Sequence, residues 1–178
     1  VAEASENHRR RASDALSARA IVVAAGIAPV RANDCLYDFR PDSDFFWLTG
    51  CRAEGAVLVM APTAGGHHAT LFIPPPAAPG EAGFFANPTH GELWVGASAG
   101  LDDWGRALGI ETRALSELDG VLARLGDGVR FGGSMRGTGA LAGSCRDPEL
   151  SQVLAHLRMI KDDWEIAQMR RAVNDTVD

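Results

Sequence analysis

The sequence contains no apolar run near the ~20 residues that an α-helix needs to cross a bilayer. It also lacks the basic start and short apolar stretch of a secretory signal peptide. Cysteine is scarce: Cys35, Cys51 and Cys145 are an odd number, and none lies in a C-x-x-C pair. This usage indicates a reducing compartment and no structural zinc. We therefore expect a cytoplasmic protein without a membrane span.

Basic charge is scarce relative to acidic charge, and the net charge is −6 at pH 7. Phosphate binding needs a basic surface, so this balance argues against nucleic acid as the main partner. The arginines at positions 9, 10 and 11 form a local cluster of the kind typical of a solvated helix face. Hydrophobic residues make up 46% and charged residues 22% of the chain, as in ordinary globular proteins. Its 178 residues fit one domain, or one domain plus a fragment.

Motifs for nucleophilic, zinc-dependent and phosphate-binding chemistry are absent: the sequence contains no H-E-x-x-H, G-x-S-x-G or P-loop pattern. One G-x-G-x-x-A match occurs at residues 137–142. A dinucleotide site would need these glycines directly at a strand end with a helix starting there, and Gly143 would break that helix within a turn. The match therefore favours a flexible loop.

Two pairs of polar residues also favour structural roles. His67 and His68 are adjacent, point to opposite sides of an extended chain, and are interpreted as part of a solvated turn rather than a metal site. Asp42 and Asp44 have turn-like neighbours, so capping and strand-entry hydrogen bonds explain them better than a catalytic carboxylate pair. Without a clustered set of Asp, His and Glu ligands, we expect the chain to hold no metal and no catalytic residue, and to bind manganese weakly.

The chain is organised around residues 40–60. Phe45–Leu48 and Ala56–Met60 are short apolar runs between turn signals, a pattern that predicts two buried strands side by side in one sheet. A helix is predicted over 5–18, capped by Ser5 and with His8 facing water. Further strands are predicted at 20–25, 69–73, 111–114 and 128–131, and further helices at 101–108 and 115–125.

The long stretch 74–92 lacks apolar periodicity and is typical of a functional or mobile loop. The hairpin-length connections of the first half and the strand–helix alternation of the second predict a mixed sheet with helices on its faces. The predicted fold class is a three-layer α/β domain.

The C-terminal end carries two predicted helices, about 150–159 and from Asp162 onward. Asp162 and Glu165 form an acidic version of the capping box, and an apolar stripe then continues to the last residues. A terminal helix folded back onto the sheet and the entry into a further domain both fit this pattern.

Four ordered motifs of the sequence resemble the N-terminal domain of Xaa-Pro aminopeptidases. The hallmark is S-D-F-F-W-L-T-G followed by E-G-A-V-L-V-M, with Asp42, Trp47 and Gly55 where the family usually has Asn, Tyr and Pro. The other three precede and follow it. They are R-x-x-D-x-x-Y at 31–37, E-x-W-x-G-x-x-x-G at 92–100, and R-M-I-K…W-E-I…R-R-A at 158–172.

This resemblance implies a ribonuclease-H-like fold for residues 1–160 and a truncated start of a C-terminal pita-bread domain at 161–178. It places catalysis in that C-terminal domain, where two manganese ions activate a water to attack the bond before proline. The chain alone is then expected to be inactive. The family also implies a homo-oligomer, a dimer or tetramer, in which Trp94 and Asp34 shape substrate access to a neighbouring subunit.

Two alternatives remain at this point. The chain fits a stand-alone interaction or oligomerisation module without an enzymatic parent. It also fits the N-terminal domain of a prolidase or creatinase relative, because those enzymes share the two-domain plan.

Overall fold

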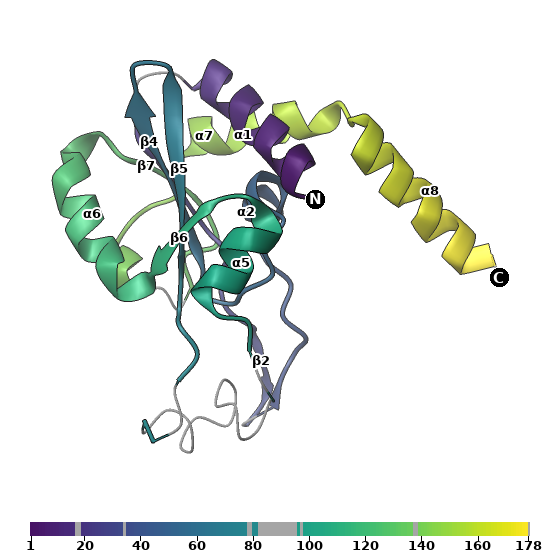
Figure 1. Ribbon diagram of the computed structural model, residues 1–178, viewed down its shortest axis with the longest axis horizontal. Coiled ribbons are helices and arrows are strands. Elements are labelled where there is room, and N and C mark those ends of the chain that lie inside the picture. Colours follow the sequence, from purple (N-terminus) through teal and green to yellow (C-terminus); the bar gives the residue numbers. More distant parts are fainter. Residues whose placement is uncertain are drawn as a thin grey trace.

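The computed structural model describes residues 1–16, 19–33, 35–77, 80–81, 96, 98–136 and 139–177. Their backbone forms a mixed sheet with helices on both faces, which confirms the predicted three-layer α/β class (Figure 1). No helix in this described part is long and apolar enough to cross a membrane.

The main sheet has five strands in the order β6-β5-β4-β1-β7. The central β4 runs antiparallel to both of its neighbours, whereas the outer pairs β1–β7 and β5–β6 are parallel. This arrangement confirms the expected combination of hairpin and crossover connections. The strands are β1 (Ile21–Ala24), β4 (Val57–Thr63), β5 (Gly66–Ile73), β6 (Glu111–Ala114) and β7 (Arg130–Gly133).

Alternate side chains of the central strands enter two separate apolar cores. In β1, Ile21 and Val23 enter one core while Val22 and Ala24 enter the other, as the two-residue period of a strand requires. The first core is covered by α1, α2, α5 and α7, and the second by α6 (Figure 1). These helices are α1 (Ala2–Ala15), α2 (Ser43–Thr49), α5 (Leu101–Leu108), α6 (Leu118–Leu125) and α7 (Pro148–Met159).

The segment predicted as the buried strand 45–48 is the helix α2, so that prediction was wrong. The Asp42 side chain accepts hydrogen bonds from the backbone N–H groups of Asp44 and Phe45, which caps the first turn. Gly50 ends the helix at φ 67°, a left-handed conformation that glycine adopts without steric cost. A two-turn helix buried in a core is apolar on most sides. Its short apolar run therefore cannot be distinguished by periodicity from that of a buried strand.

Helix α1 also differs from its prediction. It begins at Ala2, so Ser5 lies inside it rather than capping it. His8 and Arg9 are buried, although both were expected to face water. The reason is that α1 packs along α2 and α7, so that two of its faces are covered instead of one.

Other corrections are smaller. His67 and His68 belong to strand β5 rather than to a turn. Between β1 and α2 the chain forms a small antiparallel hairpin of β2 (Val30–Ala32) and β3 (Cys35–Leu36), which was not predicted. Most of the predicted loop 74–92 lies outside the described residues, as do Gly137 and Thr138 of the glycine motif.

Candidate functional site

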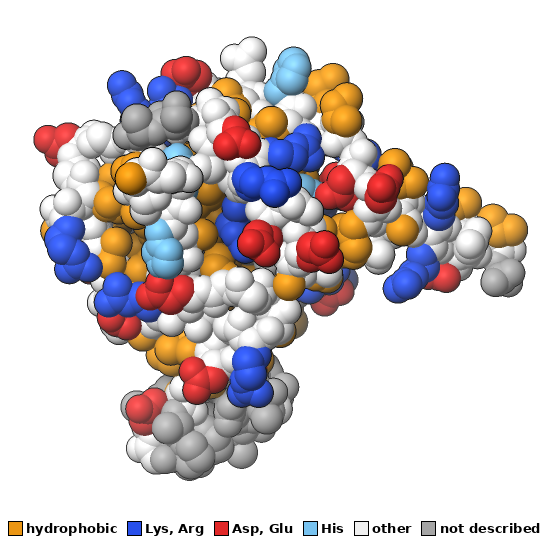
Figure 2. All heavy atoms as spheres, turned by 45° about the horizontal axis from the view of Figure 1, so that its top comes forward, with side chains coloured by type: hydrophobic (Ala, Val, Ile, Leu, Met, Phe, Trp, Pro, Cys, Tyr) orange, Lys and Arg blue, Asp and Glu red, His pale blue; other side chains and the backbone are white. Residues whose placement is uncertain are grey.

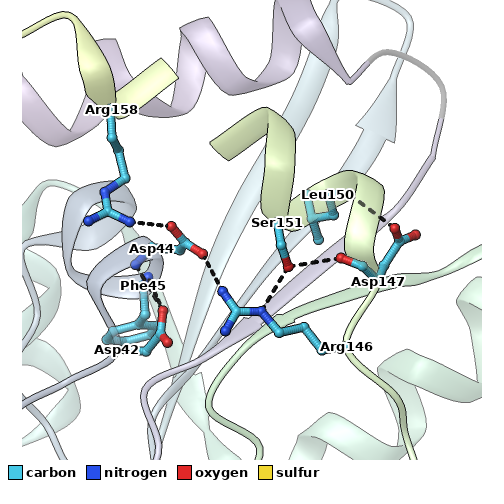
Figure 3. Close-up of polar contacts among 8 residues, drawn as sticks. All are labelled: Asp42, Asp44, Phe45, Arg146, Asp147, Leu150, Ser151 and Arg158. Carbon is cyan, nitrogen blue, oxygen red and sulfur yellow. Dashed lines mark hydrogen bonds and ion pairs between the residues drawn. The ribbon is translucent and has the colours of Figure 1, made fainter. Parts of the chain in front are cut away.

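Polar side chains converge where α1, α2, α7 and the start of α8 (Asp163–Val177) meet. Asp44 in the first turn of α2 is a buried carboxylate, with its side chain 3% exposed. Its Oδ2 accepts a hydrogen bond from Arg146 Nη2 at 2.9 Å, and its Oδ1 accepts one from Arg158 Nη1 at 2.6 Å (Figure 3). Both carboxylate oxygens are therefore paired, and Asp44 serves as a structural anion that joins α2 to α7.

The arginines themselves are held by α7. Arg146 Nε donates to Ser151 Oγ at 2.8 Å, and that hydroxyl donates to the Asp147 carbonyl at 2.9 Å (Figure 3). Asp147 also caps α7, because its Oδ1 accepts from the Leu150 N–H at 3.0 Å. The capping role expected for Asp42 is confirmed, while Asp44 acts through ion pairs that link distant elements.

His8, on α1, contacts α2 at Trp47. Its ring stacks on Trp47 with centroids 4.2 Å apart and an interplanar angle of 11°. Its Nδ1 lies 2.8 Å from the Trp47 carbonyl oxygen, and its Nε2 lies 2.8 Å from Asp162 Oδ2 and 3.7 Å from Glu165 Oε2. His8 thereby ties α1 to α2 and to the first turn of α8.

The two carboxylates of this cluster are fixed by the predicted capping box. The Glu165 N–H donates to Asp162 Oδ1 at 2.8 Å, and the Asp162 N–H donates to Glu165 Oε2 at 3.0 Å. Burial raises the pKa of Asp162, but the backbone hydrogen bond from Glu165, the hydrogen bond and charge of His8 and the charge of Arg11 lower that pKa to a net value below its ordinary one. Among the described residues, His8, Asp162 and Glu165 form a group able to hold a metal ion.

A cavity of about 440 Å³ adjoins this cluster, a size within the usual range of ligand pockets. Its lining includes His8 and Glu165 together with Arg40, Arg52 and Arg158. Arg52 lies over the Phe46 ring, with its Cζ 5.3 Å from the ring centroid. The remaining walls include the aromatic rings of Phe39, Phe46, Trp47 and Trp164.

Helix α8 projects away from the body of the molecule and none of its residues is buried (Figure 1). Its apolar stripe is exposed to solvent: Met169 is 57%, Val173 61% and Val177 81% exposed. Figure 2 shows hydrophobic side chains along the arm at the right of the view, with basic ones beside them. The stripe therefore does not fold back onto the sheet in this chain.

The two residues predicted to shape substrate access, Asp34 and Trp94, lie outside the described residues. The neighbours of Asp34 belong to the β2–β3 hairpin, whose residue Val30 is 65% exposed. Asn33 there has φ 48°, a left-handed conformation that asparagine tolerates better than most residues. On the other side of the long loop, Gly96 is exposed.

The cluster around His8 was not predicted from the sequence. His8 and Asp162 lie 154 positions apart in the chain, and no spacing rule connects His8 to the two carboxylates. The capping box correctly predicted that Asp162 and Glu165 lie together at the start of a helix. The sequence did not indicate that a buried histidine from another helix would contact them.

Comparison with known proteins gives one family. The family described as "Aminopeptidase P, N-terminal domain" matches residues 5–130. The chain is 38% identical over 189 residues to Xaa-Pro aminopeptidase 1 of Streptomyces coelicolor, covering 99% of this chain and 37% of that protein. It is 34% identical over 172 residues to Xaa-Pro aminopeptidase 2 of the same organism, covering 92% of this chain and 36% of that protein. The chain thus spans just over a third of the length of these relatives.

Solved structures share the fold at lower identity. Proline aminopeptidase P II from Yersinia pestis superposes with a TM-score of 0.70 at 22% identity, covering 97% of this chain and 42% of that one. Zinc-substituted E. coli aminopeptidase P, in complex with product, gives a TM-score of 0.61 at 22% identity, covering 86% of this chain and 32% of that one.

Proposed function

The chain belongs to the aminopeptidase P N-terminal domain family, and on this premise we propose that it is the accessory domain of an Xaa-Pro aminopeptidase. The complete enzyme would remove the N-terminal residue that precedes a proline. A peptide bond to proline is a tertiary amide without an N–H, which explains the need for a dedicated peptidase. The observation that carries the proposal is the family match over residues 5–130, together with identity to Streptomyces Xaa-Pro aminopeptidases along the whole chain.

Catalysis is assigned to a C-terminal domain that begins at about residue 161 and holds two manganese ions. Two observations support this division: the chain matches just over a third of its relatives, and the apolar stripe of α8 is exposed. A following domain would cover that stripe. The cluster of His8, Asp162 and Glu165 offers too few ligands for two metal ions, so no step of hydrolysis is assigned to this chain.

The accessory domain would act by supporting a homo-oligomer and by shaping substrate access in trans. Asp34 would attract the ammonium group of a peptide bound to a neighbouring subunit, and the flat ring of Trp94 would pack on that peptide. Residues 30–33, which directly precede Asp34 in the chain, are exposed, and this supports the surface role proposed for Asp34. A cytoplasmic location stays a prediction.

The Trp94→Ala substitution in the complete enzyme tests this role. We expect kcat/KM for an Xaa-Pro peptide to fall more than tenfold, which corresponds to about 1.4 kcal/mol of transition-state stabilisation. The Tm of the 178-residue chain should hardly change. If the substitution instead unfolds the chain, Trp94 is a core residue and the role in trans is wrong.

The alternatives give different results in the same assays. A stand-alone interaction module would have no associated peptidase activity. A prolidase relative would cleave Xaa-Pro dipeptides but not longer Xaa-Pro peptides, and a creatinase relative would cleave neither.

A further inference from the structure

We propose that His8, Asp162 and Glu165 form a zinc-binding site that fastens α8 to the body of the domain. The first observation concerns the tautomer of His8. Its Nδ1 lies 2.8 Å from the Trp47 carbonyl oxygen, and because a carbonyl can only accept, Nδ1 must carry a hydrogen. In the neutral ring, Nε2 is then an acceptor.

This acceptor faces two further acceptors. The Nε2 atom is directed at Asp162 Oδ2 and Glu165 Oε2, and His8 itself is only 2% exposed. His8 is buried and the two carboxylates are partly buried, so a positive species between these three acceptors would stabilise them: either a proton on Nε2 or a metal cation.

The surroundings of the three groups are those of a metal site. A zinc-ligating histidine usually donates its other ring N–H to a backbone carbonyl, as His8 does to Trp47, and stacking on the Trp47 ring fixes its orientation. The two carboxylates are oriented by the reciprocal hydrogen bonds of their capping box. One nitrogen and two oxygen ligands suit zinc, and three protein ligands leave a fourth position for water.

For the two separations that involve His8, the geometry needs only a small adjustment. The three ligand atoms already lie within 4.8 Å of one another. Tetrahedral zinc with bonds of about 2.0–2.1 Å places its ligand atoms about 3.3 Å apart. The 2.8 Å separation of Nε2 and Asp162 Oδ2 would lengthen by about 0.5 Å and the 3.7 Å separation of Nε2 and Glu165 Oε2 would shorten by about 0.4 Å, within rotamer freedom.

The charge of the ligands and the access to the site are also compatible with a bound metal ion. Aspartate and glutamate carboxylates are ionised at neutral pH, which is the form that binds metal. The adjoining cavity, bordered by His8 and Glu165, gives an entry path. Arg11, whose charge acts on Asp162, and Arg158 at the cavity oppose a cation, so we expect a Kd on the micromolar scale rather than tighter.

Zinc chloride titrated calorimetrically into the metal-free 178-residue chain tests the proposal. We expect one equivalent to bind and, at zinc 100-fold above Kd, the Tm to rise by about 5 to 10 °C. Manganese should bind more weakly than zinc, following the general order of divalent metal affinities.

Two variants remove ligands while keeping the helix cap. Asp162→Asn retains a good N-cap residue and Glu165→Gln retains the capping box, so both should fold. Each should weaken zinc binding at least tenfold. His68→Gln is the matched control, because His68 also faces one carboxylate, that of Glu111, but on the exposed surface. It should bind zinc as the unsubstituted chain does.

The proposal is overturned if the unsubstituted chain binds no zinc at these concentrations, since a proton then fills the site. It is equally overturned if both ligand variants bind zinc as the unsubstituted chain does, or if His68→Gln abolishes binding.

Discussion

At the scale of single residues, Asp44 is the charge on which the packing of α2 against α7 depends. Replacing it with alanine leaves Arg146 and Arg158 without their shared anion. Removing one partner of a fully buried ion pair costs about 3 to 5 kcal/mol, but both arginines here are partly exposed and can rehydrate. We therefore expect Asp44→Ala to lower the free energy of unfolding by about 2 kcal/mol.

Urea denaturation of the 178-residue chain measures this effect. Asp42→Asn is the control, because asparagine caps a helix about as well as aspartate and should change stability by less than about 0.5 kcal/mol. Equal stability of Asp44→Ala and the unsubstituted chain would show that the ion pairs contribute nothing.

Single residues could be interpreted correctly from the sequence where their partners are close in the chain, but not where their partners are distant. Asp42 was correctly interpreted as a cap, because its partners are the next few backbone N–H groups. His8 was placed in water, because nothing near it in sequence reveals Trp47 or Asp162 as partners. The expectation of no metal rested on cysteine usage and on the lack of a clustered Asp, His and Glu ligand set, and it did not foresee that folding brings His8 to Asp162 and Glu165.

At the scale of elements, the strands were easier to predict than the short helix. The apolar runs at β1 and β4 are bounded by turn residues and enriched in valine, which is typical of buried strands. Helix α2 has the same kind of composition, and at seven residues it is too short for helical periodicity to appear. The decisive signals were local ones, Asp42 at its start and Gly50 at its end, and both also fit a turn.

Strand β7 gives a test at this scale. Gly133 has φ 77°, and a Cβ added there would lie 2.2 Å from the backbone oxygen of Ala24 on the paired β1. We expect Gly133→Ala to destabilise the chain by more than about 2 kcal/mol, because β7 must shift away from β1. Thermal unfolding should show a Tm lower by about 4 to 8 °C or more.

Gly65→Ala is the matched control, since Gly65 lies in the β4–β5 turn and a Cβ there meets no atom within 4 Å. It should change the Tm by no more than about 2 °C. A Tm for Gly133→Ala as high as that of the control would mean that the β1–β7 contact tolerates a side chain.

At the scale of the whole molecule, sequence periodicity predicted the three-layer arrangement of helices and sheet, whereas the proposed function rests on sequence motifs. Hairpin-length connections in the first half and strand–helix alternation in the second were enough to predict the mixed sheet. The sequence did not decide whether α8 packs on the sheet or against a further domain, because an apolar stripe predicts that a helix face is covered but does not identify the covering surface. The structure leaves that stripe exposed along a projecting helix.

The proposed action between subunits makes Asp34 testable. Asp34→Asn in the complete enzyme should raise KM for an Xaa-Pro peptide, because a charge that attracts the substrate ammonium is lost. The increase should shrink as salt is added, since exposed charges are screened. Steady-state kinetics at low and high salt measure both effects.

Asp38→Asn is the control, because Asp38 is an exposed carboxylate in the same loop with no assigned role. It should leave KM within twofold of the unsubstituted enzyme. An unchanged KM for Asp34→Asn at low salt would leave Asp34 only a turn residue.

The central claim, an accessory domain of an Xaa-Pro aminopeptidase, is tested most directly by parallel hydrolysis assays. The complete protein and the 178-residue chain are each incubated with manganese and a peptide whose second residue is proline, and release of the first residue is measured. A matched peptide with alanine at the second position controls for specificity. The account predicts that the complete protein cleaves only the proline peptide and that the chain cleaves neither. Hydrolysis by the chain alone, or no cleavage of the proline peptide by the complete protein, would contradict it.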